Sequence, residues 1–369
     1  MTSQHKQAAP AGPLEGVRVI DLSAVLMGPY ATQIFGDHGA DVIKIESPEG
    51  DSTRWIGPGR HPGMGPLFLH LNRNKRSVAL DLKTPQGAAA MRRLIEGADV
   101  FVHNLRPASI ARLGLDYESI SMINPRIIWC GVYGYGEDGP YAGRPAYDDL
   151  IQGAVGIAAL QQQSGASEPR YVPLTIADRM VGLHAAHSVA MALYGRERTG
   201  RGCRIDVPMF ETMASVVLSD HLYGLTFEPP SGDTGYVRLL SPGRRPYETS
   251  NGYICALVYN DGHWQRFLHA IERDDLRVDP GTGRVNRAGR ELPVLPVGLR
   301  ILATLMRHHP RVVTRAELQS ITHGRVFGLF ADNHMDPEID RPALRLDLAG
   351  RADRERAQQR AGSSSPCGE

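Results

Sequence analysis

Cysteine is scarce in this sequence. The 369 residues include only four, Cys130, Cys203, Cys255 and Cys367. These four form no CxxC pair and no spacing typical of a zinc site. The sequence therefore offers neither a disulfide framework nor a cysteine-based metal centre, and we expect a reducing, cytoplasmic compartment.

Long apolar runs and an excess of charge are also missing. No run approaches the ~20 apolar residues that a helix needs to cross a bilayer. Residues 1–13 lack the apolar centre typical of a signal peptide, and we predict a disordered leader there. The 41 basic and 40 acidic side chains leave a formal net charge of +1. That balance does not favour nucleic acid or an anionic membrane as a partner.

The sequence does have enough apolar residues for a sizeable core. Its 42% hydrophobic and 22% charged residues are typical of a globular protein, and its length suits two or three domains. Helical segments alternate with apolar, β-branched runs, so we predict an α/β fold with a mostly parallel sheet flanked by helices. The runs predict strands at 17–22, 41–46, 77–82, 99–104 and 126–132.

The next part of the chain predicts more helices. Residues 148–195 are rich in Ala, Gly and Met, as close-packed helices are. A glycine loop then feeds a strand at 198–207. Residues 209–228 suit one long helix, and the Gly-, Pro- and Arg-rich stretch at 229–247 suits a loop.

Six segments between residues 14 and 211 together resemble one known family. They are LEGVRVIDLSAVLMGPYATQIFGDHGADVIKIE, NKRSVALDLKTPQG, DVFVHNLRPASIARLG, NPRIIWCGVYGYGEDGPYAGRPAYDDLIQG, VPLTIADRMVGLHAA and RTGRGCRIDVPMFE. Their order and spacing are similar to those of the family III CoA transferases (CaiB/BaiF, formyl-CoA-transferase type), and weaker similarity continues to about residue 273.

The resemblance carries several implications. It implies a Rossmann-like large domain at 14–228, the start of a small domain at 229–275, and an interlocked homodimer. It also implies exchange of CoA between an acyl-CoA and a free carboxylic acid, with no metal and no tightly bound cofactor.

Asp178, in TIADRMVG, matches the position of the family's catalytic aspartate. The resemblance implies that its carboxylate attacks the thioester and forms a covalent aspartyl intermediate. Apolar neighbours on both sides in the sequence would desolvate the carboxylate and improve it as a nucleophile. The ordinary alternative is that Asp178 only caps the helix that follows it, as aspartate often does.

Tyr147 and Asp148 match positions that line the family's active site, where they would orient the acyl group. The alternative is an ordinary helix start with acidic residues in its first turn. The related α-methylacyl-CoA racemases have a histidine where Tyr147 stands. The resemblance therefore favours a transferase over an acyl-CoA racemase.

Three groups of residues match segments of the family that contact CoA. Their basic side chains would pair with phosphate oxygens, and Leu80 and Leu82 would flank the adenine. Taken singly, each residue could instead be a solvated cation or a core leucine. The predicted CoA-contacting residues are Leu80, Asp81, Leu82, Lys83, Asn104, Leu105, Arg106 and Arg112.

Val25, Leu26 and Met27 follow the first predicted strand and match the loop that approaches the thioester in the family. The oxalate-specific members have a glutamine at the position of Leu26 and an arginine at the position of Ser47. These two differences argue against formyl-CoA:oxalate exchange. Leu26 favours a larger or less polar acyl group.

Beyond residue 275 we expect a truncated or replaced C-terminal region. Residues 276–324 resemble part of the winged-helix domain of response regulators. Turns at 279–283 and 286–291 predict a small sheet there, and residues 314–317 form a capping box. The basic recognition helix of such domains is missing, and we predict a poorly defined tail at 325–369.

Two alternatives to an acyl-CoA:carboxylate CoA transferase stay open. One is an acyl-CoA racemase or epimerase of the same superfamily. The other is an inactive or acyl-CoA-sensing chain fused to a partial DNA-binding domain, which a steep salt dependence of DNA affinity would support.

Overall fold

The computed structural model describes residues 12–249, 252–258, 260–270, 276–279, 284–287 and 290–292. The chain divides into two compact units, residues 1–244 and residues 245–369. Most of the predicted leader, the predicted capping box and the predicted C-terminal tail lie outside the described residues.

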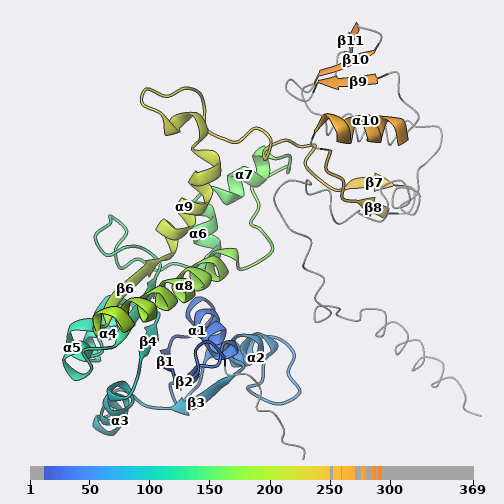
Figure 1. Cartoon of the computed structure of the whole chain (residues 1–369). Helices are drawn as coiled ribbons and strands as arrows, with labels where there is room; N and C mark the ends of the chain where they lie inside the picture. The colour runs from blue at the N-terminus through green and yellow to red at the C-terminus, as the bar shows by residue number, and fades with distance from the viewer. Residues whose placement is uncertain are drawn as a thin grey trace, which may run out of the picture. The chain divides into compact units, whose positions relative to one another are not determined.

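A six-stranded parallel sheet forms the centre of the first unit (Figure 1), in the order β3-β2-β1-β4-β5-β6. The strands are β1 (Arg18–Leu22), β2 (Asp41–Glu46), β3 (Lys75–Ala79), β4 (Val100–His103), β5 (Ile128–Tyr133) and β6 (Cys203–Pro208). This arrangement confirms the predicted α/β fold and has the strand order of a doubly wound, Rossmann-type sheet. Strand order reverses between β1 and β4, and ligands of such sheets bind beyond the carboxyl ends of the strands at that point.

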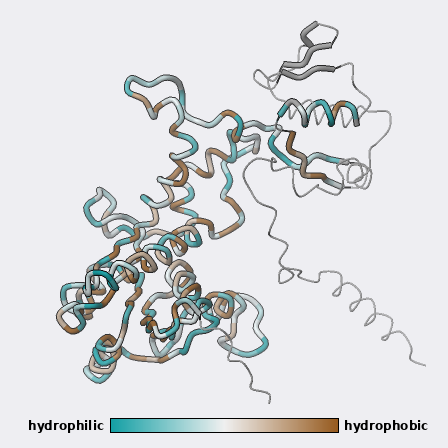
Figure 2. Tube along the Cα trace, viewed as in Figure 1, coloured by the Kyte–Doolittle hydropathy of each residue, from teal (hydrophilic) through white to brown (hydrophobic). Residues whose placement is uncertain are grey.

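The strands are apolar on both faces of the sheet. In β4, Val100 and Val102 pack into one hydrophobic cluster, and Phe101 between them packs into the other. Figure 2 shows this strand as a brown, hydrophobic stretch. Successive side chains of a strand point to opposite faces, so a sheet covered on both sides requires a continuous apolar run.

Helices cover both faces of this sheet. Side chains of α1, α6, α8 and α9 belong to the cluster on one face, and side chains of α3, α4 and α5 belong to the cluster on the other. The helices are α1 (Met27–Asp37), α2 (Pro66–Asn72), α3 (Pro85–Glu96), α4 (Pro107–Arg112), α5 (Tyr117–Ile123), α6 (Asp148–Ala154), α7 (Ile157–Gln163), α8 (Ile176–Thr199) and α9 (Met209–His221), with short 3₁₀ helices η1 (Ser52–Trp55) and η2 (Tyr223–Thr226).

Two predicted boundaries were wrong. The strand predicted at 77–82 is Lys75–Ala79 and ends before Asp81, because Asp81 accepts a hydrogen bond from the Lys83 N–H (3.0 Å) and turns the chain out of the sheet. The helix predicted at 209–228 ends at His221. A Cβ added to Gly224 would lie 2.3 Å from the carbonyl carbon of Gly232, so the returning loop occupies space that a longer helix would need.

The second unit contains two small antiparallel sheets and one helix, α10 (Asp261–Ala270). Strands β7 (Tyr247–Thr249) and β8 (Gly252–Ile254) form one sheet, and β9 (Leu276–Asp279), β10 (Arg284–Arg287) and β11 (Arg290–Leu292) form the other. The second sheet confirms the strands predicted around the turns at 279–283 and 286–291.

No helix in the part of the chain that the structure describes combines the length and the apolar character needed to cross a bilayer. The same residues include no group of three or more His, Cys, Asp or Glu side chains placed to hold a metal ion.

Candidate active site

Asp178 lies in the first turn of α8, where helix N–H groups have no acceptor within the helix. Its N–H donates instead to Oδ1 of Asp148, at 3.0 Å. Asp148 thus caps α8 from the start of another helix, whereas the N-cap position of α8 itself is Thr175. The Asp178 side chain is therefore not the cap that ordinary aspartate usage suggested. Its carboxylate accepts no hydrogen bond from the residues that the structure describes.

The surroundings of Asp178 favour the protonated form of its side chain. Burial, and then the negative charge of Asp148, raise the pKa of Asp178 to about 7. Arg179 acts in the opposite direction, and its guanidinium lies over the ring of Tyr30, 4.6 Å from the centroid. Near neutral pH, Asp178 therefore exchanges readily between a carboxylic acid and a carboxylate that is more basic than one in water.

Asp148 is held in place by its own helix. Its side chain is buried, and Oδ2 accepts a hydrogen bond from Nε2 of Gln152 at 2.6 Å. The other end of this amide, Oε1, accepts the N–H of Val172 at 2.9 Å. These contacts fix both the position and the orientation of the Asp148 carboxylate beside Asp178.

Tyr147 precedes Asp148 and is 73% exposed. It lines a cavity of about 270 Å³, which we call the Tyr147 pocket. Two arginines, Arg106 and Arg144, line the same pocket together with one acidic side chain, Glu137. Of the residues predicted from the sequence, the pocket brings together Met27, Asn104, Arg106 and Tyr147.

A second cavity, of about 420 Å³, lies at the carboxyl ends of β1, β2 and β3. We call it the Lys83 pocket. An adjoining cavity shares Lys83 and extends to Arg112, so two cations flank a continuous hollow. Of the predicted residues, the Lys83 pocket and its extension bring together Leu80, Asp81, Leu82, Lys83, Leu105 and Arg112.

Residues 23–27, after β1, connect the two pockets. Ser23 and Ala24 line the Lys83 pocket, and Met27 lines the Tyr147 pocket. The side-chain amide of Asn104, at the end of β4, accepts the N–H of Ala24 (2.9 Å) and donates to its carbonyl (2.7 Å). Both strands that flank the reversal point of the sheet therefore contribute to this connecting segment.

Two predicted residues of this segment line neither pocket. Leu26 is only 8% exposed, and Val25 lies in the left-handed backbone region with a φ of 70°. The three cavities do not place the Leu26 side chain against an acyl group, so its predicted effect on acyl size stays a prediction.

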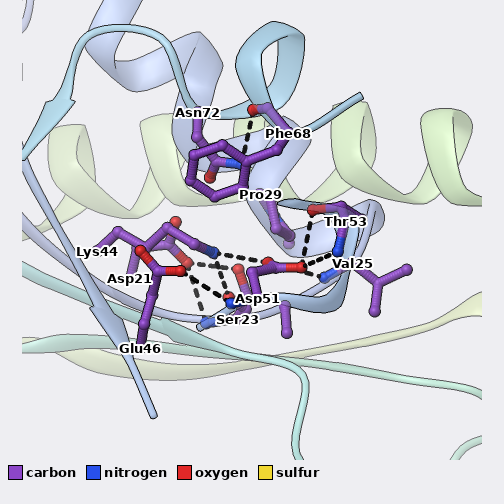
Figure 3. A network of polar contacts seen from close by, with 12 residues as sticks. Asp21, Ser23, Val25, Pro29, Lys44, Glu46, Asp51, Thr53, Phe68 and Asn72 are labelled. Carbon is purple, nitrogen blue, oxygen red and sulfur yellow. Dashed lines mark hydrogen bonds and ion pairs between the residues drawn. The ribbon is translucent and has the colours of Figure 1, made fainter. Parts of the chain in front are cut away.

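A buried ionic network lies beneath the connecting segment (Figure 3), and the sequence analysis missed it. Lys44 Nζ lies 3.0 Å from Asp51 Oδ2, and both side chains are 1% exposed. Lys75 Nζ lies 2.9 Å from Asp21 Oδ2, and these side chains are also buried. Burial alone would raise the pKa of Asp21, but the two lysines hold that pKa well below its usual range.

One sequence feature signals part of this network. Lys44 interrupts the apolar strand DVIKIE at a position that a covered sheet must bury. A buried ammonium group requires an acidic partner. That partner, Asp51, lies in the loop beyond the strand, and the sequence does not single it out among the other acidic residues nearby.

Comparison with known proteins identifies the family of this chain. The family model described as CoA-transferase family III matches residues 14–319. The chain is 33% identical over 353 residues to the succinate–glutarate CoA-transferase of Agrobacterium fabrum, which covers 91% of this chain and 85% of that one. It is 40% identical over 274 residues to the succinyl-CoA–L-malate CoA-transferase beta subunit of Chloroflexus aurantiacus, covering 72% and 66%.

A solved structure of the CaiB/BaiF family is also similar to this chain. The crystal structure of a CaiB/BaiF family protein from Brucella suis superposes with a TM-score of 0.70 at 32% identity, covering 85% of this chain and 82% of that one. The family match reaches residue 319, so the expectation that the family pattern ends near residue 273 was wrong. The predicted winged-helix resemblance at 276–324 gains no support from these comparisons. The chain belongs to CoA-transferase family III.

Proposed function

We propose that this protein moves CoA from an acyl-CoA to a free carboxylic acid through a covalent intermediate on Asp178. The observation that best supports this proposal is the environment of the Asp178 carboxyl group. It is mostly buried beside the Asp148 carboxylate, its pKa is raised to about 7, and the residues described around it give its carboxylate no hydrogen bond. Such a carboxylate is a better nucleophile than a solvated one.

The first half of the reaction consists of two substitutions. A carboxylate oxygen of Asp178 attacks the thioester carbonyl, the carbon–sulfur bond breaks, and CoA leaves as the thiolate while a mixed anhydride forms. The thiolate then attacks the carbonyl of the Asp178 side chain, which releases the first acid as its carboxylate and leaves CoA on the enzyme as a thioester.

The second half repeats these steps with the acceptor. The acceptor carboxylate attacks the enzyme thioester and forms a second anhydride, and the thiolate attacks the acceptor's carbonyl. A new acyl-CoA leaves and Asp178 is regenerated as a carboxylate. No proton is gained or lost over the four substitutions, so this series of steps requires no general acid.

The Lys83 pocket suits the nucleotide end of CoA. Phosphate groups bind most strongly to lysine and arginine side chains. Lys83 and Arg112 line this hollow, which also includes the acidic side chains of Glu49 and Asp81. Leu80, Leu82 and Leu105 give it apolar walls against which a planar adenine can pack. The connecting segment 23–27 then leads from this hollow to the Tyr147 pocket.

The Tyr147 pocket suits a second negative charge on the acid. Arg106 and Arg144 outnumber the single acidic residue, Glu137. The Arg144 guanidinium lies over the Tyr141 ring, 4.6 Å from its centroid, which leaves its N–H groups at the guanidinium edge available to a carboxylate. Two relatives of this chain are named for succinate, glutarate and malate. We therefore propose a short dicarboxylic acid as acceptor.

A racemase is the less favoured function. The related racemases use a histidine together with the aspartate for proton transfer, and the residue at the matched position here is Tyr147. A phenol at the edge of the Tyr147 pocket supports orientation of an acyl group.

A homodimer is the proposed assembly, in the cytoplasm. Large apolar side chains are exposed along α8 and α9, and an exposed apolar surface of this kind favours burial against a partner. They are Leu183, Met191, Tyr194, Val216 and Leu218.

The test is a transfer assay with the full chain. Succinyl-CoA and glutarate are incubated with the protein, and succinate and glutaryl-CoA are quantified by chromatography. Stoichiometric appearance of both products that is abolished in Asp178→Ala supports the proposal. Isomerisation of a 2-methylacyl-CoA without any transfer would instead support the racemase.

A further inference from the structure

Val25 adopts a backbone conformation that its side chain disfavours. Its φ is 70°, in the left-handed region, where the Cβ of an L-residue crowds the following carbonyl. A β-branched residue there is a genuine outlier. Such a conformation is strained and persists only when the surroundings enforce it.

The surroundings of Val25 enforce this conformation through backbone hydrogen bonds. The Val25 N–H donates to Oδ2 of Asp51 at 3.2 Å. Two residues earlier, the Ser23 carbonyl accepts from Nζ of Lys44 at 2.9 Å. The amide of Asn104 fixes Ala24 between them through two further bonds. Figure 3 shows the contact between Lys44 and Asp51 next to Ser23 and Val25.

The Lys44–Asp51 pair is itself fixed. Asp51 Oδ1 accepts from the N–H and the hydroxyl of Thr53, at 3.0 and 2.8 Å. The Asp51 N–H donates to Oε2 of Glu46 at 2.9 Å. A buried pair with its remaining lone pairs satisfied resists rearrangement, so it can hold a strained loop.

The strained residue lies between residues that line the two pockets. Ser23 and Ala24 line the Lys83 pocket and Met27 lines the Tyr147 pocket, so Val25 links the two along the chain without lining either. The Met27 carbonyl packs against Gly182 of α8, one turn beyond Asp178. A shift of segment 23–27 would therefore alter its contact with the helix that carries Asp178.

We propose that Lys44 and Asp51 are positioning residues that hold Val25 in its left-handed conformation, so that segment 23–27 presents the acyl-CoA thioester to Asp178. This inference rests on the proposed function. The pair touches neither the reacting carbonyl nor Asp178, and it acts through the backbone of Ser23 and Val25.

The test is a rescue experiment. In the double variant Lys44→Met/Asp51→Leu, an apolar pair replaces the ion pair without leaving a buried charge unpaired, which proteins often tolerate. Val25 can then relax out of the left-handed region. We expect kcat for succinyl-CoA and glutarate to fall by about 10- to 100-fold, as for a displaced reacting group, with a smaller change in KM for succinyl-CoA.

Adding Val25→Gly to the double variant should recover at least half of the lost kcat on a logarithmic scale, because glycine adopts positive φ without strain. As a matched control, Asn74→Gly relieves another left-handed residue, with φ 61°, and should restore nothing.

Several outcomes would overturn the inference. A folded double variant with full kcat, or a triple variant no more active than the double, would show that the pair is only structural. If the double variant does not fold, the same comparison is made on Asp51→Asn, with and without Val25→Gly. Absence of CoA transfer by the unaltered protein would instead contradict the proposed function. This result is distinct from a failure of the positioning role, which requires an active unaltered protein.

Discussion

At the scale of single residues, the site depends on two carboxyl groups with different surroundings. Asp148 has a hydrogen-bond donor for each oxygen, the Asp178 N–H and the Gln152 amide. The Asp178 carboxyl group is instead largely buried, and its neighbour is the negatively charged Asp148. The two carboxyl groups therefore differ in role, because burial beside a negative charge raises the pKa of Asp178 and makes its carboxylate the more reactive one.

The first prediction concerns pH. Attack requires ionised Asp178, whose pKa is raised to about 7 by burial first and by Asp148 second. We expect kcat/KM for succinyl-CoA to rise as pH increases through about 7 and then to level off. Asp148→Asn removes the neighbouring charge but keeps an oxygen for the Asp178 N–H, so the midpoint should move to lower pH. A midpoint that does not move in this variant would count against coupling between the two groups.

The second prediction concerns substrate charge. Arg144→Gln should lower kcat/KM for glutarate by about 10- to 100-fold, the loss expected for a charge-assisted hydrogen bond. Pentanoate, which has a methyl group in place of the second carboxylate, should be used equally by both proteins. Parallel rate measurements with the two acids make the comparison. Equal losses for glutarate and pentanoate would contradict a dicarboxylate site at Arg144.

At the scale of elements, the contact between α1 and α8 sets the position of Asp178. A Cβ on Gly182 would lie 2.7 Å from the Met27 carbonyl oxygen and 3.0 Å from Cδ1 of Tyr30. Only glycine permits this approach. Gly195, on the same helix, has open space around an added Cβ, which provides a matched control.

The third prediction uses this pair of glycines. Gly182→Ala should destabilise the protein by about 1–3 kcal/mol through overpacking and lower kcat, because α8 moves relative to segment 23–27. Gly195→Ala should leave kcat unchanged and stabilise the protein by about 0.5–1 kcal/mol, since glycine is unfavourable within a helix. Urea unfolding and steady-state kinetics measure both. Similar behaviour of the two variants would show that the close approach does not matter.

The elements also show what the sequence could predict. Continuous apolar runs revealed the strands, because a parallel sheet is covered on both faces. The end of β3 was missed because all but the first of its residues are exposed, so no burial pattern marks the boundary. The positions of the Lys83 pocket and the Tyr147 pocket depend on the order of the strands in the sheet. That order is set by pairing between distant segments, which no local sequence pattern reveals.

The candidate site shows a similar division. Asp178, Tyr147 and Asp148 were proposed through family resemblance, and the structure brings Asp148 and Asp178 into contact. Asp51 was missed, because its importance comes from Lys44 and Val25, which lie on other segments. The left-handed conformation of Val25 could not be foreseen, since a β-branched residue argues against it.

At the scale of the whole molecule, the fourth prediction concerns assembly. The exposed apolar side chains of α8 and α9 should be buried between two copies of the chain. Light scattering coupled to size-exclusion chromatography should therefore give twice the chain mass of 40.4 kDa. Met191→Glu, placed within this exposed surface, should lower that mass toward a monomer. A monomeric original protein that transfers CoA would contradict the proposed homodimer.

The most direct test of the central claim is the intact mass of the protein after incubation with succinyl-CoA, with and without hydroxylamine. We predict an added mass corresponding to CoA in thioester linkage, its conversion by hydroxylamine to a hydroxamate on the peptide that contains Asp178, and neither product in Asp178→Ala. Transfer without any hydroxylamine-labile adduct, or an adduct that persists in Asp178→Ala, would contradict covalent catalysis by this aspartate.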